Sequence, residues 1–285
     1  MIYLDNAATT RPIPEVRAAM APFLDAEYGN ASSLHSAGRR ARRALEDARE
    51  SVARFLGADP KEIVFTAGAT ESDHLAIAGA AGALRAKGDH LITTTIEHPS
   101  VLESCARLEK QGWRVTRVAV DNLGIVDPAA VAAAVTPRTV LASVMAVNNE
   151  VGTIQPIAEI RRLIPGVLLH VDAAQAVGKI PVGVADADLL TLSAHKIHGP
   201  QGAGALWVRK GVALEAQLPG GGQEFERRAG TENVAGAAGL AAAIKAARLR
   251  PPEALRERLR VGLELLGGVR VPGHPDRRTA HILHV

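Results

Sequence analysis

Residues 192–200 read LSAHKIHGP and follow an apolar stretch that ends in Leu189 and Leu190. This pattern indicates a buried strand that ends just before Lys196, with serine, histidine and glycine around the lysine. Such a position is unfavourable for a charged lysine that needs water around it, but it suits a lysine whose amine is desolvated. Burial disfavours the ammonium form and frees the nitrogen as a nucleophile. The stretch therefore predicts a reactive lysine at a strand end.

A second apolar run, residues 167–171, ends in Asp172. A lysine that forms a Schiff base and an aspartate that holds a protonated pyridine nitrogen are the two protein groups that pyridoxal phosphate (PLP) chemistry needs most. Lys196 and Asp172 together therefore make PLP the candidate cofactor.

Short apolar strands and amphipathic helices alternate along most of the chain. In residues 38–57, for example, apolar side chains recur at three- and four-residue steps until Gly57. This alternation predicts an α/β fold with a mainly parallel sheet and helices on both faces, and ligands in such sheets bind outside the carboxyl ends of the strands. Besides the two strands above, strands are predicted at 62–65, 90–95, 113–120, 139–147 and 202–208, and helices at 38–57, up to about 86, 99–111, 128–134, 157–164, 234–248 and 253–266.

The pattern changes after about residue 210. Residues 219–223 read as a flexible loop, and Pro251 and Pro252 separate the last two predicted helices. Two short strands are predicted at 269–271 and 280–285. We therefore expect a large domain over residues 16–248 and the start of an incomplete small α+β domain over residues 249–285, with residues 1–15 associated with the small domain.

The composition excludes several classes of protein. The chain has 285 residues, of which 47% are apolar, and a formal net charge of +3, without a nucleic-acid-binding motif. It has one cysteine, no histidine or cysteine spacing typical of a metal site, no signal peptide and no apolar run of membrane-spanning length. We expect a cytoplasmic globular protein with no bound metal, nucleic acid or membrane.

Several residues are candidates for holding the phosphate of PLP. Residues 66–71, including Ala69 and Thr70, link a strand to a helix whose free N–H groups suit an anion, although the same stretch could be an ordinary helix cap. Ser193 and His195 bracket Lys196 and could hold the same phosphate. Residues 227–233 combine cations, a glycine and a hydroxyl before a helix, which is another arrangement that suits phosphate.

Other polar residues follow the predicted strands. His98 could stack on the pyridine ring and move protons, or be a turn residue before a proline. Gln175 could bond the ring oxygen of PLP, and Asn148 could do the same or hold a substrate carboxylate, although buried amides at strand ends are often only loop caps. Cys105 lies within a predicted helix, and its leucine neighbours favour a buried, inert thiol.

Seven blocks of the sequence together resemble the cysteine desulfurases, which are PLP enzymes of the class V aminotransferase fold. They run in order from residue 1 to about residue 240. The blocks are YLDNAATT at 3–10, GNASSLH at 29–35, TAGATES at 66–72, VNNEVG at 147–152, HVDAAQ at 170–175, SAHKIHGP at 193–200 and RAGTEN at 228–233.

The resemblance implies a two-domain, fold-type I PLP protein that works as a homodimer. By similarity, Lys196 holds PLP covalently, His98 stacks on its ring, Asp172 pairs with the pyridine nitrogen and Gln175 contacts the ring hydroxyl. The phosphate is bound by Thr70, Ser193 and His195, with Thr231 reaching it from the neighbouring subunit, and Asn148 orients the substrate. The implied reaction converts L-cysteine to L-alanine and leaves a persulfide on an enzyme thiol, for delivery to an acceptor or scaffold protein in iron–sulfur cluster assembly.

The sequence departs from the family's pattern in one respect. Family members continue well past the position of Val285, and the persulfide cysteine and the arginine that grips the substrate carboxylate lie in that later segment. Cys105 is not at the nucleophile's position. The sequence therefore predicts cofactor binding but not sulfur transfer by these 285 residues. Two alternatives stay open, a selenocysteine lyase or other class V aminotransferase-type enzyme, and a truncated paralogue that binds PLP without catalysis.

Overall fold

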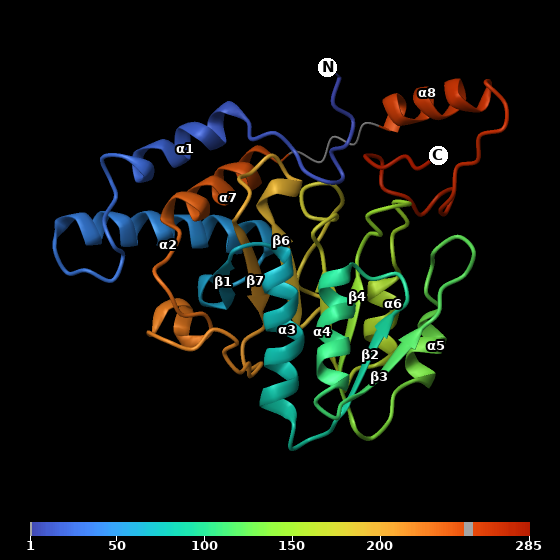
Figure 1. Cartoon of the computed structure of the whole chain (residues 1–285), viewed down its shortest axis with the longest axis horizontal. Coiled ribbons are helices and arrows are strands. Elements are labelled where there is room, and N and C mark those ends of the chain that lie inside the picture. The colour runs from blue at the N-terminus through green and yellow to red at the C-terminus, as the bar shows by residue number, and fades with distance from the viewer. Residues whose placement is uncertain (1, 248–252) are drawn as a thin grey trace.

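The computed structural model describes residues 2–247 and 253–285. Its centre is a seven-stranded sheet in the order β1-β7-β6-β5-β4-β2-β3 (Figure 1). The strands are β1 (Ile63–Thr66), β2 (His90–Thr94), β3 (Arg114–Val118), β4 (Thr139–Met145), β5 (Leu168–Asp172), β6 (Leu189–Ser193) and β7 (Gly204–Val208).

Five strands of the sheet are parallel. β2, β3, β4, β5 and β6 run in one direction, and β7 is antiparallel to both of its neighbours, β6 and β1. The residues of β2, β6 and β7 are all buried, as expected for strands covered on both faces. The predicted α/β class with a mainly parallel sheet is confirmed.

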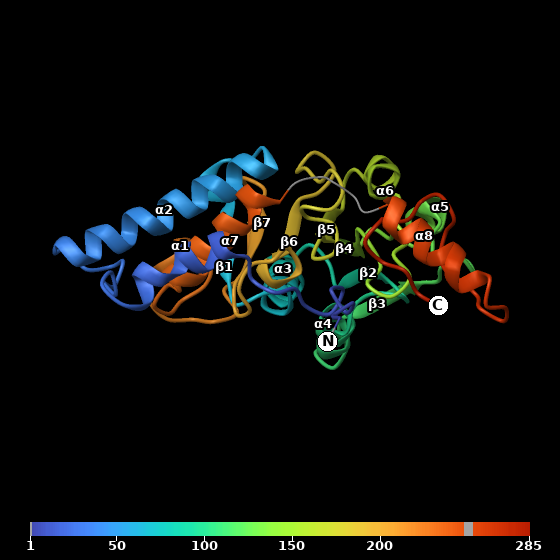
Figure 2. The ribbon, with the colours of Figure 1, turned by 90° about the horizontal axis from the view of Figure 1, so that it is seen from above.

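Helices cover both faces of the sheet, as Figure 2 shows from above. The helices are α1 (Pro14–Leu24), α2 (Ser36–Leu56), α3 (Ala69–Leu84), α4 (Pro99–Glu109), α5 (Pro128–Ala133), α6 (Ile157–Leu163), α7 (Val234–Ala246) and α8 (Glu253–Glu264). Apolar residues of α3 and α4 pack on one face of the sheet, and those of α2, α5, α6 and α7 pack on the other. Successive residues of one strand contribute to opposite faces, as Leu141 and Ala142 of β4 do.

The helix α2 illustrates why these segments adopt their structure. Its buried side chains Ala41, Leu45, Ala48 and Val52 form one stripe at helical spacing. The helix ends at Gly57, whose φ of 72° is in the left-handed region that glycine adopts without strain. Burying a side chain such as Leu45 contributes roughly 1.5–3 kcal/mol, so this stripe fixes the helix on the sheet.

The structure differs from the sequence-based expectations mainly near the two ends of the chain. The strands predicted at 269–271 and 280–285 are wrong, because both segments are irregular and the backbone near them pairs only at an isolated bridge between Arg278 and Thr153. The helix α1 was not predicted, and the expected domain boundary between residues 15 and 16 falls inside it. The expected boundary between residues 248 and 249, and the predicted end of the helix at residue 248, lie outside the described residues.

Candidate cofactor site

A cavity of about 1030 Å³ opens at the carboxyl ends of β4, β5 and β6. This is the edge at which parallel α/β sheets bind ligands. Eight of the ten residues singled out from the sequence line it, namely Ala69, Thr70, His98, Asp172, Gln175, Ser193, His195 and Lys196. They come from four separate segments of the chain, so the fold has gathered them.

Lys196 lies in a short 3-10 turn, Ala194–Lys196, directly after β6. Its Nζ atom donates hydrogen bonds to the carbonyl oxygens of Ala7 at 2.6 Å and Ala8 at 2.9 Å. Burial lowers the pKa of this amine, and the carboxylates of Asp172 and Asp5 only partly oppose that effect. The neutral, nucleophilic amine is therefore more accessible than in a solvated lysine.

Asp172 is the last residue of β5 and is only 7% exposed. Its Oδ1 atom accepts a hydrogen bond from the backbone N–H of Ala174 at 2.9 Å. Burial raises the pKa of this carboxyl, whereas the Ala174 hydrogen bond and electrostatic interactions with His98 and Lys196 lower it. A cation placed beside Asp172 would hold it in the ionised form.

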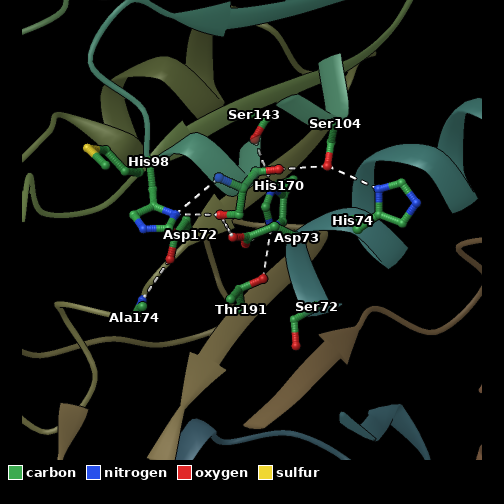
Figure 3. A network of polar contacts seen from close by, with 12 residues as sticks. Ser72, Asp73, His74, His98, Ser104, Ser143, His170, Asp172, Ala174 and Thr191 are labelled. Carbon is green, nitrogen blue, oxygen red and sulfur yellow. Dashed lines mark hydrogen bonds and ion pairs between the residues drawn. The ribbon is translucent and has the colours of Figure 1, made fainter. Parts of the chain in front are cut away.

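His98 caps the N-terminus of α4 and is exposed to the cavity. Its Nδ1 atom accepts a hydrogen bond from the backbone N–H of Ser100 at 3.1 Å and lies 2.8 Å from the Ser100 hydroxyl (Figure 3). These contacts hold the ring at the wall of the cavity and engage only one of its two nitrogens. A helix cap of this kind was not foreseen from the sequence.

One end of the cavity offers several unused hydrogen-bond donors. Ala69 and Thr70 begin the 16-residue helix α3, whose N-cap residue Gly68 supplies no side-chain cap and has a φ of 150°. The hydroxyl of Ser193 is buried and has no hydrogen-bond partner in the described part of the chain. Burial and the nearby charges of Lys196 and Lys179 lower the pKa of His195. Backbone N–H groups and hydroxyls of this kind suit a phosphate.

Gln175 also lines the cavity and is held by two contacts. Its Nε2 donates to the carbonyl oxygen of Ala7 at 2.8 Å, and its Oε1 accepts from Nζ of Lys179 at 2.6 Å. Because Nζ of Lys179 donates, the atom that it contacts must be the amide oxygen of Gln175, and the NH2 group must face Ala7. Burial and the charge of Lys196 lower the pKa of Lys179 to about 7. Lys179 was not singled out from the sequence, although it lies only four residues after Gln175.

Two of the ten residues lie outside the cavity. Asn148 is buried, and its Oδ1 accepts from the backbone N–H groups of Glu150 and Val151, at 3.0 Å each. Its Nδ2 donates to the carbonyl oxygen of Ile96 at 3.2 Å. Asn148 therefore caps its own loop, which was the structural alternative weighed for it. Thr231 is exposed and does not line the cavity of its own chain.

The N-terminal segment forms part of the cavity, a role that sequence reasoning did not assign. Asp5, Ala7, Ala8 and Thr9 line the site, and the backbone N–H of Thr10 donates to the carbonyl oxygen of His195 at 2.9 Å. Residues 3–10 form one of the blocks that resemble the cysteine desulfurases, but they do not follow a predicted strand and so were not assigned to the site. Their small residues were the available signal, because they let the backbone approach a ligand closely.

Cys105 lies in α4 and is 1% exposed. Burial raises the pKa of its thiol to about 12, and a thiol in that state is not a nucleophile at neutral pH. The inward face expected from its leucine neighbours is thus confirmed.

Known proteins resemble this chain over nearly its whole length. The family model for aminotransferase class V matches residues 2–284. The chain is 45% identical to a cysteine desulfurase IscS of Methanosarcina thermophila, over 100% of this chain and 73% of that protein, and 51% identical to one of Anaeromyxobacter dehalogenans, over 92% and 68%. It is 49% identical to a cysteine desulfurase IscS of Dictyoglomus turgidum over 87% of this chain, and spans 64% of that relative's length.

Solved structures agree with the sequence relatives. A NifS-like protein matches with a TM-score of 0.95 and 40% identity, covering 98% of this chain and 80% of that chain. A structure of SspA in complex with cysteine matches with a TM-score of 0.88 and 38% identity, covering 93% and 78%. In residues 2–247 and 253–285, no helix is both long and apolar enough to cross a membrane. The chain belongs to the class V aminotransferase family of PLP-dependent enzymes and, within it, to the cysteine desulfurases.

Proposed function

We propose that this chain is the PLP-binding part of an enzyme that converts L-cysteine to L-alanine and passes the sulfur to a thiol as a persulfide, for iron–sulfur cluster assembly. The observation that carries the proposal is the placement of Lys196 and Asp172 in one cavity, at the carboxyl ends of adjacent strands. The cysteine in the SspA structure supports cysteine as the substrate.

The residues of the cavity fit PLP. A volume of about 1030 Å³ leaves room for a cofactor and an amino acid. The unpartnered hydroxyl of Ser193 and the uncapped start of α3 provide a phosphate end, to which Ala69, Thr70 and His195 would contribute. At the other end, Lys196 would hold the cofactor covalently, Asp172 would face the pyridine nitrogen, Gln175 would donate to the ring oxygen and His98 would stack on the ring.

When bound, PLP supplies an electron sink for negative charge that develops on the substrate carbon. The ionised carboxyl of Asp172 would strengthen that sink by keeping the pyridine nitrogen protonated. Lys196, with its lowered pKa, can take a proton from the substrate carbon and return it elsewhere on the same molecule. His98 offers a second nitrogen on the cavity side for proton transfer.

Asn148 would act on the substrate indirectly. Its amide holds the loop whose next residues, Asn149 and Glu150, line the cavity. Replacing Asn148 would move those two side chains, so we expect it to shape the substrate side of the site rather than touch the cofactor.

A thiol other than that of Cys105 is proposed to accept the sulfur. The bond between carbon and sulfur breaks, the sulfur joins the accepting thiol as a persulfide, and the carbon skeleton gains a proton to become alanine. Cys105 is the one cysteine of these 285 residues and is buried and protonated. The accepting thiol therefore has to come from further chain or from another protein, such as a sulfur acceptor or scaffold.

We also propose that the protein is a cytoplasmic homodimer in which Thr231 reaches the partner's phosphate site. Thr231 is exposed and does not line the cavity of its own chain, which favours such a role. Mixing Lys196→Ala chains with Thr231→Ala chains should then restore PLP binding in some dimers. No gain over either variant alone, with subunit exchange verified, would contradict the shared site.

The substrate is tested by spectroscopy on the PLP-loaded chain. L-cysteine should change the visible absorption of the bound cofactor at concentrations at which L-serine does not. Adding dithiothreitol as the accepting thiol should then release alanine and sulfide. If L-selenocysteine or a 2-oxo acid reacts and L-cysteine does not, the substrate assignment is wrong.

A further inference from the structure

A fully buried carboxyl group lies near two residues that line the cavity, Asp172 and His98. Asp73 of α3 is 0% exposed, and its Oδ2 atom lies 2.6 Å from the Ser100 hydroxyl oxygen (Figure 3). Its Oδ1 atom has no hydrogen-bond partner in the described residues and lies 3.6 Å from Nε2 of His170. Asp73 is thus linked to His98 through one serine, because that same hydroxyl oxygen is 2.8 Å from Nδ1 of His98.

Among the residues that the structure describes, none next to Asp73 is a cation that would balance a negative charge. From β5, Asp172 and His170 face it, and from the segment between β2 and α4, Glu97 lies nearby. Burial lowers the pKa of His170 to about 3, so this ring is neutral. Burial and the charge of Asp172 raise the pKa of Asp73 well above its usual range, although the nearby hydroxyls of Ser100 and Thr191 act to lower it. An ionised Asp73 would be an uncompensated charge in the core.

The hydrogen-bond directions around Ser100 lead to the same conclusion. The backbone N–H of Ser100 points at Nδ1 of His98, so this nitrogen presents its lone pair. If Asp73 were ionised, the Ser100 hydroxyl would donate to Asp73 and turn an oxygen lone pair toward Nδ1, which is repulsive at 2.8 Å. If Asp73 carries the proton, it donates to Ser100, and Ser100 donates to Nδ1. Every contact is then a hydrogen bond.

We propose that Asp73 is a positioning residue that carries a proton in the folded protein and, through Ser100, holds His98 as the tautomer with its proton on Nε2. The inference rests on the proposed function, because it concerns the ring that would stack on PLP. Asp73 and Asp172 form a pair of neighbouring carboxyl groups that then carries one proton, on Asp73. Asp172 stays ionised and would face the pyridine nitrogen. His98 would thus begin the reaction with a proton to give on its free nitrogen.

Nitrogen NMR of histidine-labelled, PLP-loaded protein tests the tautomer, with the His98 signal assigned from its loss in His98→Gln. Wild type should show the Nε2–H form. Asp73→Asn should show the same form, because an amide N–H replaces the acid proton. Ser100→Ala should lower the ratio of Nε2–H to Nδ1–H by about three- to tenfold, the value of one lost hydrogen bond. Infrared difference spectra of wild type against Asp73→Asn should lose the stretch of a protonated carboxylic acid.

An ionised Asp73 gives opposite results. Asp73→Asn and Ser100→Ala would then both raise the Nε2–H fraction, and no protonated-acid stretch would disappear in Asp73→Asn. Either result, or an unchanged ratio in Ser100→Ala, overturns the proposal. Asp172→Asn is the matched control, since the ionised member of the pair should not tolerate the neutral isostere and PLP affinity should fall. The same NMR experiment on cofactor-free protein tests Asp73 even if PLP does not bind, so failure of the two proposals is distinguishable.

Discussion

The end of β6 and the middle of α4 each hold a side chain that could act as a nucleophile, and burial affects the two in opposite ways. At the end of β6, burial lowers the pKa of the Lys196 amine. In α4, burial raises the pKa of the Cys105 thiol to about 12. In both cases the protein favours the neutral form. A neutral amine is a nucleophile, whereas a neutral thiol is not.

The comparison shows that location at a strand end matters as much as burial. Lys196 is only partly buried and opens onto the cavity, so its amine can reach a ligand. Cys105 packs among apolar residues of α3, α4 and the sheet, including Leu75 and Val101, and does not line the cavity. Lys196 is therefore placed to react with a ligand, whereas Cys105 contributes to core packing.

The largest expected effect is the loss of covalently bound cofactor in Lys196→Ala. Without the amine, the visible absorption of lysine-bound PLP should be absent after gel filtration. Lys179→Met is the matched control, because Lys179 is also partly buried and has a lowered pKa but does not line the cavity. It should keep the covalent cofactor, with weaker affinity, since Gln175 loses its partner. Retention of the band in Lys196→Ala would show that another lysine does this work.

Replacing Asp172 should have the next largest effect. Asp172→Asn removes a charge-assisted hydrogen bond to the pyridine nitrogen, worth about 1.5–3 kcal/mol, so the Kd for PLP should rise roughly 10- to 100-fold. Equilibrium dialysis measures it, and circular dichroism checks that the fold is retained. An unchanged Kd would make Asp172 a purely structural strand-end residue.

The pH dependence of cofactor capture tests the lowered pKa of Lys196. Only the neutral amine attacks PLP, so the capture rate of apoprotein should rise with pH and level off below the ordinary lysine value of about 10.4. The carboxylate of Asp172 raises the pKa of Lys196. Asp172→Asn should therefore move the plateau to lower pH. A plateau at the pH of free lysine would mean that the amine is solvated.

The smallest effect is expected at Cys105. Cys105→Ala should leave the Kd for PLP unchanged and cost about 1 kcal/mol of unfolding free energy, as measured by urea denaturation. In the native wild-type protein the thiol should resist alkylation at pH 8 and react once the chain unfolds. Rapid alkylation of the native protein, or loss of sulfur release in Cys105→Ala alone, would make Cys105 a sulfur carrier.

Much of the fold could be predicted from the sequence because its signals are local. The apolar runs before Asp172 and before Lys196 are β5 and β6, and the stripe on residues 38–57 is α2. The strand predictions at 269–271 and 280–285 are wrong because a strand needs a partner, and apolar residues alone do not specify one. The helix α1 starts with Pro14 and has only one buried side chain, so its periodic signal is weak.

The candidate site was predicted only in part, for a related reason. Residues at strand ends, such as Asp172, were identifiable because parallel strands share one binding edge. The pairing of Asp73 with Ser100, and of Lys179 with Gln175, depends on how α3, α4 and the turn after β5 pack together. A charged residue such as Asp73 among the apolar positions of α3 was the available signal. For Asn148 the sequence left two alternatives open, and its own loop uses its amide.

The central claim is that Lys196 is the residue that holds PLP. Borohydride reduction of the PLP-loaded chain, followed by proteolysis and mass spectrometry, measures this directly. The account predicts one reduced PLP adduct, on the peptide that contains Lys196, at close to one cofactor per chain. An adduct on Lys179 or on any other lysine, or no adduct at all, would contradict it.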